Sequence, residues 1–218
     1  MRLNRRDFSA ALLSTALFGR TLADAKIAAP MPVVPTEGVH FERKAPTVPV
    51  ATGTLIEVIE FFSYACPHCL AFETPLEAWV SALPKDVAFR RVPVPFIGNA
   101  AALQRLYFAL EVEGHVEALQ AKVFTAVQPG PLMLESQRDV DAFAISNGID
   151  ASSFMRAYKS QRVSDLVAGA TAAVRRYELG SVPTLAVQGR FLTSPAQAGS
   201  AENALKTTDY LIESVRRG

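Results

Sequence analysis

Both cysteines of this 218-residue chain lie in one short segment, Cys66-Pro67-His68-Cys69, between an apolar run and a stretch of helical spacing. At i and i+3 of a first helical turn, the two sulfurs share one face and can cycle between dithiol and disulfide. Pro67 is tolerated there because its missing N–H would be unsatisfied anyway. The positive helix end, and His68 if protonated, would favour a thiolate at Cys66. We expect Cys66 to be the nucleophile and Cys69 the resolving thiol.

Two other uses of the cysteines fit less well. A structural zinc site needs four ligands, yet only His40, His68 and His115 could join the cysteines, at spacings unlike a finger or ribbon. A permanent disulfide would close a very short loop and remove little entropy from the unfolded chain. We therefore expect a redox pair, with no metal and no cofactor.

The segments around the motif predict a βαβ unit. Residues 54–62 are β-branched and aromatic, the nearly continuous apolar pattern of a parallel strand covered on both faces. A helix follows from the motif to Leu83, and Pro75 is expected to kink it. Residues 87–94 predict the second strand.

Residues 100–180 carry almost only helical signals. Gly114 and Gly148 read as helix ends, Ser136 and Asp139 as a capping box, and Asp150 as an N-cap. Strand signals return at residues 184–188 and 191–192, and a last helix is expected over residues 201–216. The order predicts an α/β fold that an all-helical segment interrupts.

The N-terminal residues have the features of a targeting segment. Residues 1–25 combine three early arginines, an apolar run over 8–18 and a small-residue end, the pattern of an export signal. The run is shorter than the roughly 20 residues that span a bilayer. The Arg5-Arg6 pair resembles a twin-arginine signal, and an ordinary secretory signal stays open. Residues 26–37 predict a Pro-rich lead-in, and the compartment is expected to be oxidising.

Composition excludes several classes of protein. Half of the residues are hydrophobic and two are cysteines, so wholesale disorder and a disulfide-dense scaffold are both excluded. The 22 basic residues nearly balance the 21 acidic ones and are scattered, so no nucleic-acid partner is expected. Because no heptad or extra domain is present, we expect a monomer.

The segment from Glu60 to Cys69, Glu-Phe-Phe-Ser-Tyr-Ala-Cys-Pro-His-Cys, resembles the active-site segment of the periplasmic DsbA family. The resemblance extends from Gly38 to the C-terminus. It implies a thioredoxin-like fold in two parts, residues 38–99 and 181–218, with a helical insertion over residues 100–180. It also implies a cis bond at Val182-Pro183, facing the cysteines, although the pattern of the residues alone would leave this bond trans. The Val182 backbone would then pair with an extended client chain.

Glu60 is a candidate proton carrier. Glu57 and Glu60 face opposite sides of one strand, and a strand covered on both faces buries or half-buries at least one of them. The family pattern selects Glu60 as a buried acid that accepts or relays the Cys69 proton. A strand-end Glu60 that reaches water is the alternative. Glu73 also matches an acidic family position, but we expect it to be a solvated helix charge.

The resemblance implies a periplasmic oxidase that donates its disulfide to unfolded exported proteins and is reoxidised by a quinone-linked membrane protein similar to DsbB. Two alternatives stay open: an isomerase or reductase on the same fold, and a peptide-binding module with incidental cysteines. Tyr64-Ala65, Pro75 and Ser181 depart from the family pattern, which leaves the shape of the peptide groove and the membrane partner open.

Overall fold

The computed structural model describes residues 34–128, 134 and 136–218. The export signal expected over residues 1–25 lies outside the described residues, as does most of the lead-in expected over residues 26–37.

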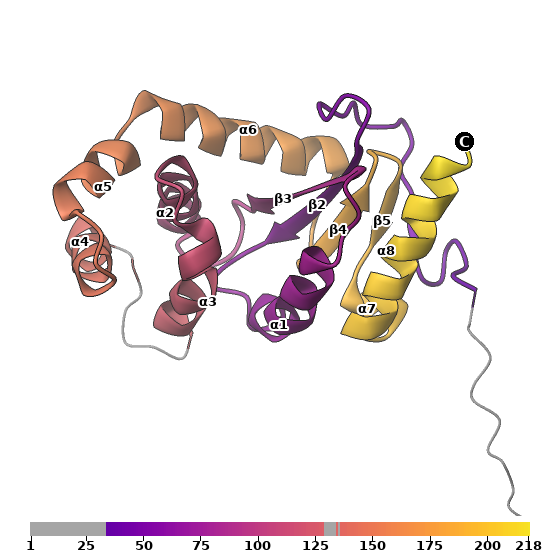
Figure 1. The fold of residues 1–218 in the computed structure, drawn as a ribbon, viewed down its shortest axis with the longest axis horizontal. Coiled ribbons are helices and arrows are strands. Elements are labelled where there is room, and N and C mark those ends of the chain that lie inside the picture. Colours follow the sequence, from indigo (N-terminus) through magenta and orange to yellow (C-terminus); the bar gives the residue numbers. More distant parts are fainter. Residues whose placement is uncertain (1–33, 129–133, 135) are drawn as a thin grey trace, which may run out of the picture. The chain divides into compact units, whose positions relative to one another are not determined.

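The described chain contains a mixed sheet in the order β1-β5-β4-β2-β3 (Figure 1). The strand before the cysteines, β2 (Ile56–Phe62), is parallel to β3 (Val87–Pro93) and antiparallel to β4 (Thr184–Val187). A tight turn joins β4 to β5 (Phe191–Thr193), which pairs with the short β1 (Glu42–Arg43). All seven residues of β2 are buried, which explains its continuous apolar pattern. The βαβ prediction is confirmed, and the parallel pairing lies on one side of β2 only.

Eight helices accompany this sheet in the described residues, and five of them lie in the chain between β3 and β4. Capping explains where several begin: Ser136 and Asp139 form the expected capping box, and Asp150 accepts a hydrogen bond from the Ser153 N–H. The helices are α1 (Pro67–Ser81), α2 (Ala100–Val112), α3 (Val116–Val127), α4 (Gln137–Ser146), α5 (Ala151–Tyr158), α6 (Gln161–Tyr177), α7 (Pro195–Ala198) and α8 (Ala201–Arg216).

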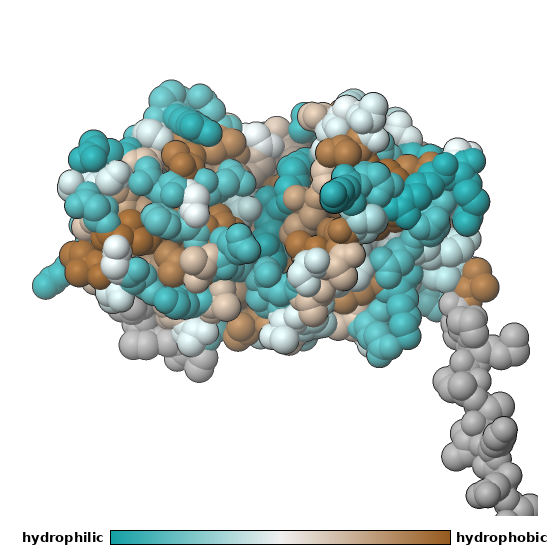
Figure 2. All heavy atoms as spheres, viewed as in Figure 1, coloured by the Kyte–Doolittle hydropathy of each residue, from teal (hydrophilic) through white to brown (hydrophobic). Residues whose placement is uncertain are grey.

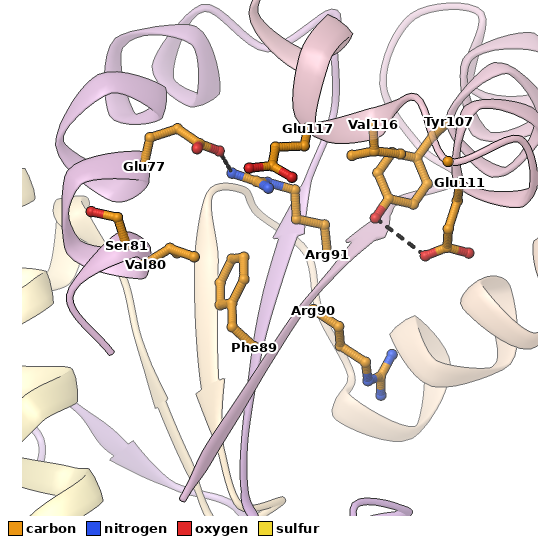
Figure 3. A pocket seen from close by; sticks show the side chains of 11 residues that line it. Glu77, Val80, Ser81, Phe89, Arg90, Arg91, Tyr107, Glu111, Val116 and Glu117 are labelled. Carbon is orange, nitrogen blue, oxygen red and sulfur yellow. Dashed lines mark hydrogen bonds and ion pairs between the residues drawn. The ribbon is translucent and has the colours of Figure 1, made fainter. Parts of the chain in front are cut away.

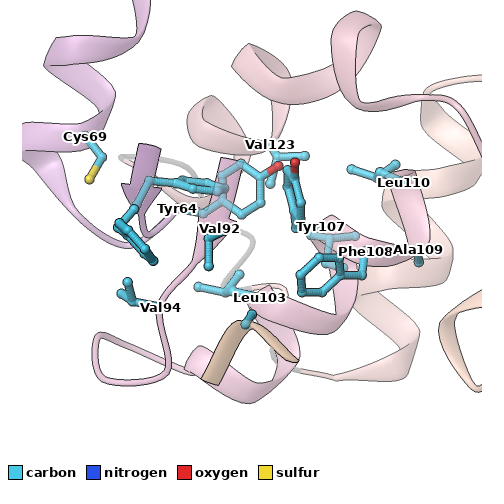
Figure 4. Packing of buried hydrophobic residues seen from close by; sticks show 14 of the residues in the cluster. Tyr64, Cys69, Val92, Val94, Leu103, Tyr107, Phe108, Ala109, Leu110 and Val123 are labelled. Atoms are coloured by element: carbon cyan, nitrogen blue, oxygen red, sulfur yellow. The ribbon is translucent and has the colours of Figure 1, made fainter. Parts of the chain in front are cut away.

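Both faces of the sheet are covered. On one face, β2 and β4 pack against α1 and α8, where Phe72 and Leu211 meet Val58 and Leu185. On the other face, Phe61 belongs to a larger apolar cluster with residues of α2, α3 and α6, part of which Figure 4 shows. The cysteine motif therefore joins a strand and a helix that packing holds in place.

Some elements were not expected from the sequence. The strand β1 has two residues and the helix α7 has four, too few for either period to be recognised. The helix α6 ends at Tyr177, and its C-cap residue Glu178 has a left-handed φ of 54°. Pro75 lies inside α1, which continues as one helix on both sides of it.

Within the part of the chain that the structure describes, no helix has the length and apolar character needed to cross a bilayer. Figure 2 shows hydrophobic and hydrophilic residues intermixed over one face. Large exposed hydrophobic side chains in the described chain include Phe96, in the loop between β3 and α2.

Candidate active site

Cys66 lies at the junction of β2 and α1, as the N-cap residue of the helix, and both cysteines are free thiols. Its backbone N–H donates to the Ser63 carbonyl at 3.0 Å, which closes a tight turn before the helix. Pro67 occupies the first helical turn, as predicted. Cys66 is only 5% exposed, so little of this residue is in contact with water.

The bond between Val182 and Pro183 is cis, as the resemblance predicts. The Cys66 thiol donates to the Val182 carbonyl across 3.6 Å, which links two residues 116 positions apart in the chain. Pro183 directly precedes β4, so the pairing of β4 with β2 places the cis-proline turn beside the cysteines. The structure thus brings Cys66 and Val182 together.

Cys69 lies one turn into α1 and is completely buried. Its backbone N–H donates to the Cys66 carbonyl at 3.0 Å, so the two residues share the first turn. Burial raises the pKa of the Cys69 thiol far above its usual range, and the nearby Cys66 and Glu60 raise it further. Cys69 is therefore held as a neutral thiol unless a base takes its proton.

His68 lies between the two cysteines in the sequence but points to solvent. Its side chain is exposed, as is that of Pro67. A cation at this position would stand at the N-terminal end of α1, where its charge acts through water rather than through the protein interior.

Glu60 is fully buried and bonds to one cation. The Arg91 guanidinium donates from Nε to Glu60 Oε2 at 3.0 Å, and Glu60 Oε1 has no partner among the described residues. Burial outweighs the attraction of Arg91 and raises the pKa of Glu60 to about 8. The alternative of a strand-end carboxylate that reaches water is therefore wrong. Glu57, on the opposite face, is also buried and bonds to Arg90.

The expectation that Glu73 is a solvated helix charge is wrong. Glu73 is 4% exposed, and Oε1 accepts a hydrogen bond from Arg91 Nη2 at 3.2 Å. The reason is that α1 packs on the sheet with this side inward, where β3 supplies the half-buried Arg91. Burial raises the pKa of Glu73 to about 7, and the neighbouring Glu77 acts in the same direction.

Arg91 is a site residue that the sequence does not reveal. Its side chain is 9% exposed and bonds to Glu60, Glu73 and Glu77, so one cation faces three carboxyl groups. In the sequence alone, the adjacent Arg90-Arg91 pair is typical of a solvated pair of charges within a strand, and its role becomes visible only when the register of β3 against β2 is known. That register pairs Glu60 with Arg91 and Glu57 with Arg90. At neutral pH, at least a fraction of the molecules therefore keeps a proton on one of these carboxyl groups.

A cavity of about 440 Å³ opens beside this cluster, away from the cysteines (Figure 3). Arg91 and Phe89 of β3 line one side, Glu77 of α1 another, and Tyr107 with Glu111 the third. The cavity connects the outer part of the carboxyl cluster with solvent. Within the described residues, no group of three or more His, Cys, Asp or Glu side chains is arranged to hold a metal ion.

Comparison with known proteins agrees with the geometry. The family model described as DSBA-like thioredoxin domain matches residues 57–202. The thiol:disulfide interchange protein DsbA of Pseudomonas syringae pv. tomato is 35% identical over 95% of this chain and 94% of its own length. That of Azotobacter vinelandii is 37% identical over 78% of this chain and 79% of its own length.

Solved structures show the same relationship. The crystal structure of Pseudomonas aeruginosa DsbA superimposes with a TM-score of 0.80 at 32% identity, over 84% of this chain and 95% of the other. The resemblance in the motif, the match in sequence and the match in fold therefore agree. The chain belongs to the DsbA family of thioredoxin-like thiol:disulfide oxidoreductases.

Proposed function

We propose that Cys66 and Cys69 are the redox pair of a dithiol oxidase that donates its disulfide to exported proteins. In the oxidised protein, a client thiolate attacks Cys66 Sγ, forms a mixed disulfide and releases Cys69 as a thiolate, which takes up a proton. A second client thiolate then attacks the client sulfur of that bond. The client gains a disulfide, and Cys66 leaves as a thiolate.

The observation that carries this proposal is the contact between the Cys66 thiol and the Val182 carbonyl at 3.6 Å, before a cis proline. A backbone carbonyl beside the reacting sulfur is a hydrogen-bond acceptor for an extended chain, as in strand addition. Val182 and Pro183 would therefore orient the client. Cys69, behind Cys66 and fully buried, is suited to resolve a mixed disulfide rather than to receive a client.

His68 and Glu60 would tune the two sulfurs differently. The N-terminal end of α1 favours a thiolate at Cys66, and a protonated His68 would add to this preference. A stabilised thiolate exists in the reduced form only, so it makes the disulfide a stronger oxidant. Glu60 would give a proton to Cys69 when the disulfide opens and take one when it closes.

The sequence and the family also suggest the compartment in which the protein acts and the partner that reoxidises its dithiol. An export signal at residues 1–25 would place it in the periplasm, where disulfides persist. Clients would be exported proteins that are still unfolded. A quinone-linked membrane oxidase of the DsbB type would reoxidise the dithiol.

The proposal is tested by equilibrating the purified protein without residues 1–25 against glutathione buffers and trapping free thiols by alkylation. A donor of disulfides keeps its thiols reduced until the buffer is strongly oxidising. A pair that oxidises readily in reducing buffer would instead indicate a reductase. The Cys66→Ala, Cys69→Ala double variant provides the second arm, because activity that survives in it would indicate a peptide-binding module.

A further inference from the structure

Tyr64, just before the cysteine motif, is tied to α3 at both of its ends. Its hydroxyl donates to Gln120 Oε1 at 2.6 Å, and its backbone carbonyl accepts a hydrogen bond from the side chain of Gln128 at the end of α3. The ring packs edge-on against Phe62 and Phe124, with centroids 5.0 Å away in both cases. The turn that presents Cys66 is thus attached to the helical part of the chain through one residue, by its side chain and its backbone carbonyl.

The bond to Tyr64 determines which way the Gln120 amide faces. A tyrosine hydroxyl that donates needs the amide oxygen, so the Gln120 NH₂ group must point to the other side. That nitrogen has no hydrogen-bond partner among the described residues, although Gln120 is 2% exposed. Glu73 Oε2 is a buried acceptor that is likewise unpartnered in the described chain. The Gln120 amide lies close enough to Glu73 to favour its charged form.

Glu73 is surrounded by groups from four directions. Arg91 approaches from β3, Glu77 from the next turn of α1, and Gln120 from α3, while Glu60 of β2 shares Arg91 with it. On α2, which also packs here, Tyr107 lies beside Tyr64 rather than beside Glu73. Of these groups, only Arg91 and Gln120 favour a negative charge on Glu73. Loss of the Gln120 amide should therefore move a proton onto Glu73.

We propose that Gln120 and Tyr64 are positioning residues for the proton transfer at Cys69. Tyr64 orients the Gln120 amide, and the nearby amide favours the charged form of Glu73, so that the proton shared by the carboxyl cluster resides on Glu60. Glu60 lies close enough to Cys69 for its charge to act on that thiol. The inference deepens the proposed function and rests on it.

The step concerned is the closing of the Cys66–Cys69 disulfide. The Cys66 thiolate attacks oxidised glutathione, forms a mixed disulfide and releases one glutathione thiolate. The Cys69 thiol passes its proton to the Glu60 carboxylate, and the Cys69 thiolate attacks Cys66 Sγ. The second glutathione leaves as a thiolate and takes a proton from solvent. Two electrons pass from the protein dithiol to the glutathione disulfide.

The test is the pH profile of this second, first-order step, measured as the limiting rate at saturating oxidised glutathione. In Gln120→Met, Glu73 takes the shared proton, no longer repels charge on Glu60, and lets Glu60 ionise at lower pH. We expect the midpoint to fall by about half a pH unit, which makes the step about threefold faster below the midpoint. Tyr64→Phe should shift it in the same direction, and the double variant should shift it no further than Gln120→Met.

Gln104→Met is the matched control. Gln104 is also a buried helical glutamine, and its amide donates to the Pro93 carbonyl at 2.8 Å outside this network. The Gln104→Met variant should be destabilised about as much as Gln120→Met and should keep the pH profile of the natural protein. Profiles of Gln120→Met and the natural protein that superimpose, or a midpoint that rises, would overturn the inference. Failure of the proposed function is distinct, because it shows in other measurements: the cysteine pair of the natural protein would oxidise readily in reducing buffer, or activity would survive in the Cys66→Ala, Cys69→Ala variant.

Discussion

Glu60 is a carboxyl group that folding removes completely from water while supplying one bond from Arg91. Its pKa of about 8 in the folded chain lies above its ordinary value of 4.5, because burial penalises the charged form more than Arg91 favours it. The residue can therefore change its charge near neutral pH, next to a thiol whose chemistry requires a proton to arrive and leave. Stability and chemistry are connected through this one side chain.

The raised pKa of Glu60 predicts how stability depends on pH. Between about 4.5 and 8 the folded chain binds a proton at Glu60 that the unfolded chain has lost, so the free energy of unfolding falls as pH rises. One such group gives a slope approaching about 1.4 kcal/mol per pH unit. We expect Glu60→Gln to flatten this slope. Denaturant unfolding from pH 5 to 8, in a Cys66→Ala, Cys69→Ala background that removes the thiols, measures it.

The conservative substitution Glu57→Gln serves as the comparison for this measurement. Glu57 is buried on the opposite face of β2 and bonds to Arg90 rather than to the carboxyl cluster. It should leave the slope between pH 5 and 8 largely intact. Equal slopes in Glu60→Gln and its parent would show that Glu60 does not hold the proton.

His68 provides a second prediction at the scale of one residue. Its exposed imidazole stands at the positive end of α1, and replacement by serine removes a side chain that, when protonated, places a positive charge beside Cys66. We expect Cys66 to react more slowly near neutral pH and the disulfide to become a weaker oxidant. The rate of alkylation by iodoacetamide against pH measures this change. The same substitution at His115, which precedes α3, should leave the profile unchanged.

At the scale of elements, the turn between β4 and β5 connects β4, the strand that follows the cis proline, to the segment around Lys44 and Val48. The Val48 N–H donates to the Gly189 carbonyl at 2.9 Å, and the Lys44 N–H donates to the Arg190 carbonyl at 2.7 Å. Gly189 has a φ of +61°, and a Cβ atom there would lie 1.9 Å from the Val48 carbonyl oxygen. Only glycine permits this approach of two backbones.

This close approach predicts opposite effects for two glycine substitutions. Gly189→Ala should destabilise the protein by at least about 2 kcal/mol, because the left-handed backbone and the clash with Val48 act together. Gly169→Ala, inside α6, meets no atom within 4 Å and should stabilise it by about 0.5–1 kcal/mol. Urea unfolding of both variants measures the contrast. A Gly189→Ala protein as stable as the natural one would show that this turn does not hold the segment around Val48.

Helix positions could be read from the sequence because their signals are local. Ser136, Asp139 and Asp150 cap helices where the pattern predicts. The role of Glu73 could not be read in this way, because it depends on a register between β2 and β3 that places Arg91 beneath α1. The same reason hides Gln120, since a buried glutamine in a helix looks like a solvated one until its partner is known.

At the scale of the whole molecule, the site joins four parts of the chain that lie far apart in sequence. The motif, Arg91, Gln120 and the Val182-Pro183 turn meet only when α3 and β4 pack around β2. Spacing alone indicates the redox pair, because both thiols lie in one helical turn. The cis bond required the resemblance to the family, since neighbouring residues do not specify a cis X-Pro bond.

Thermodynamic linkage gives the last prediction, which concerns the entire fold. If the folded protein is a stronger oxidant than its unfolded chain, the disulfide must be less favourable folded than unfolded, so reduction must stabilise the fold. The difference between the two unfolding free energies equals the difference in redox free energy, about 1.4 kcal/mol for each 30 mV. We expect the reduced form to be more stable, by about 3 kcal/mol if the potentials differ by about 60 mV.

Urea unfolding of the oxidised and reduced protein at one pH measures this difference, and the glutathione equilibria of the folded and the urea-unfolded protein give it independently. The Cys66→Ala, Cys69→Ala variant must be equally stable in oxidising and reducing buffer, since it has no disulfide to form. An oxidised form more stable than the reduced form would reverse the sign of the cycle. Electrons would then flow out of this dithiol into its substrates, as in a reductase, and the donor role proposed for Cys66 would be wrong.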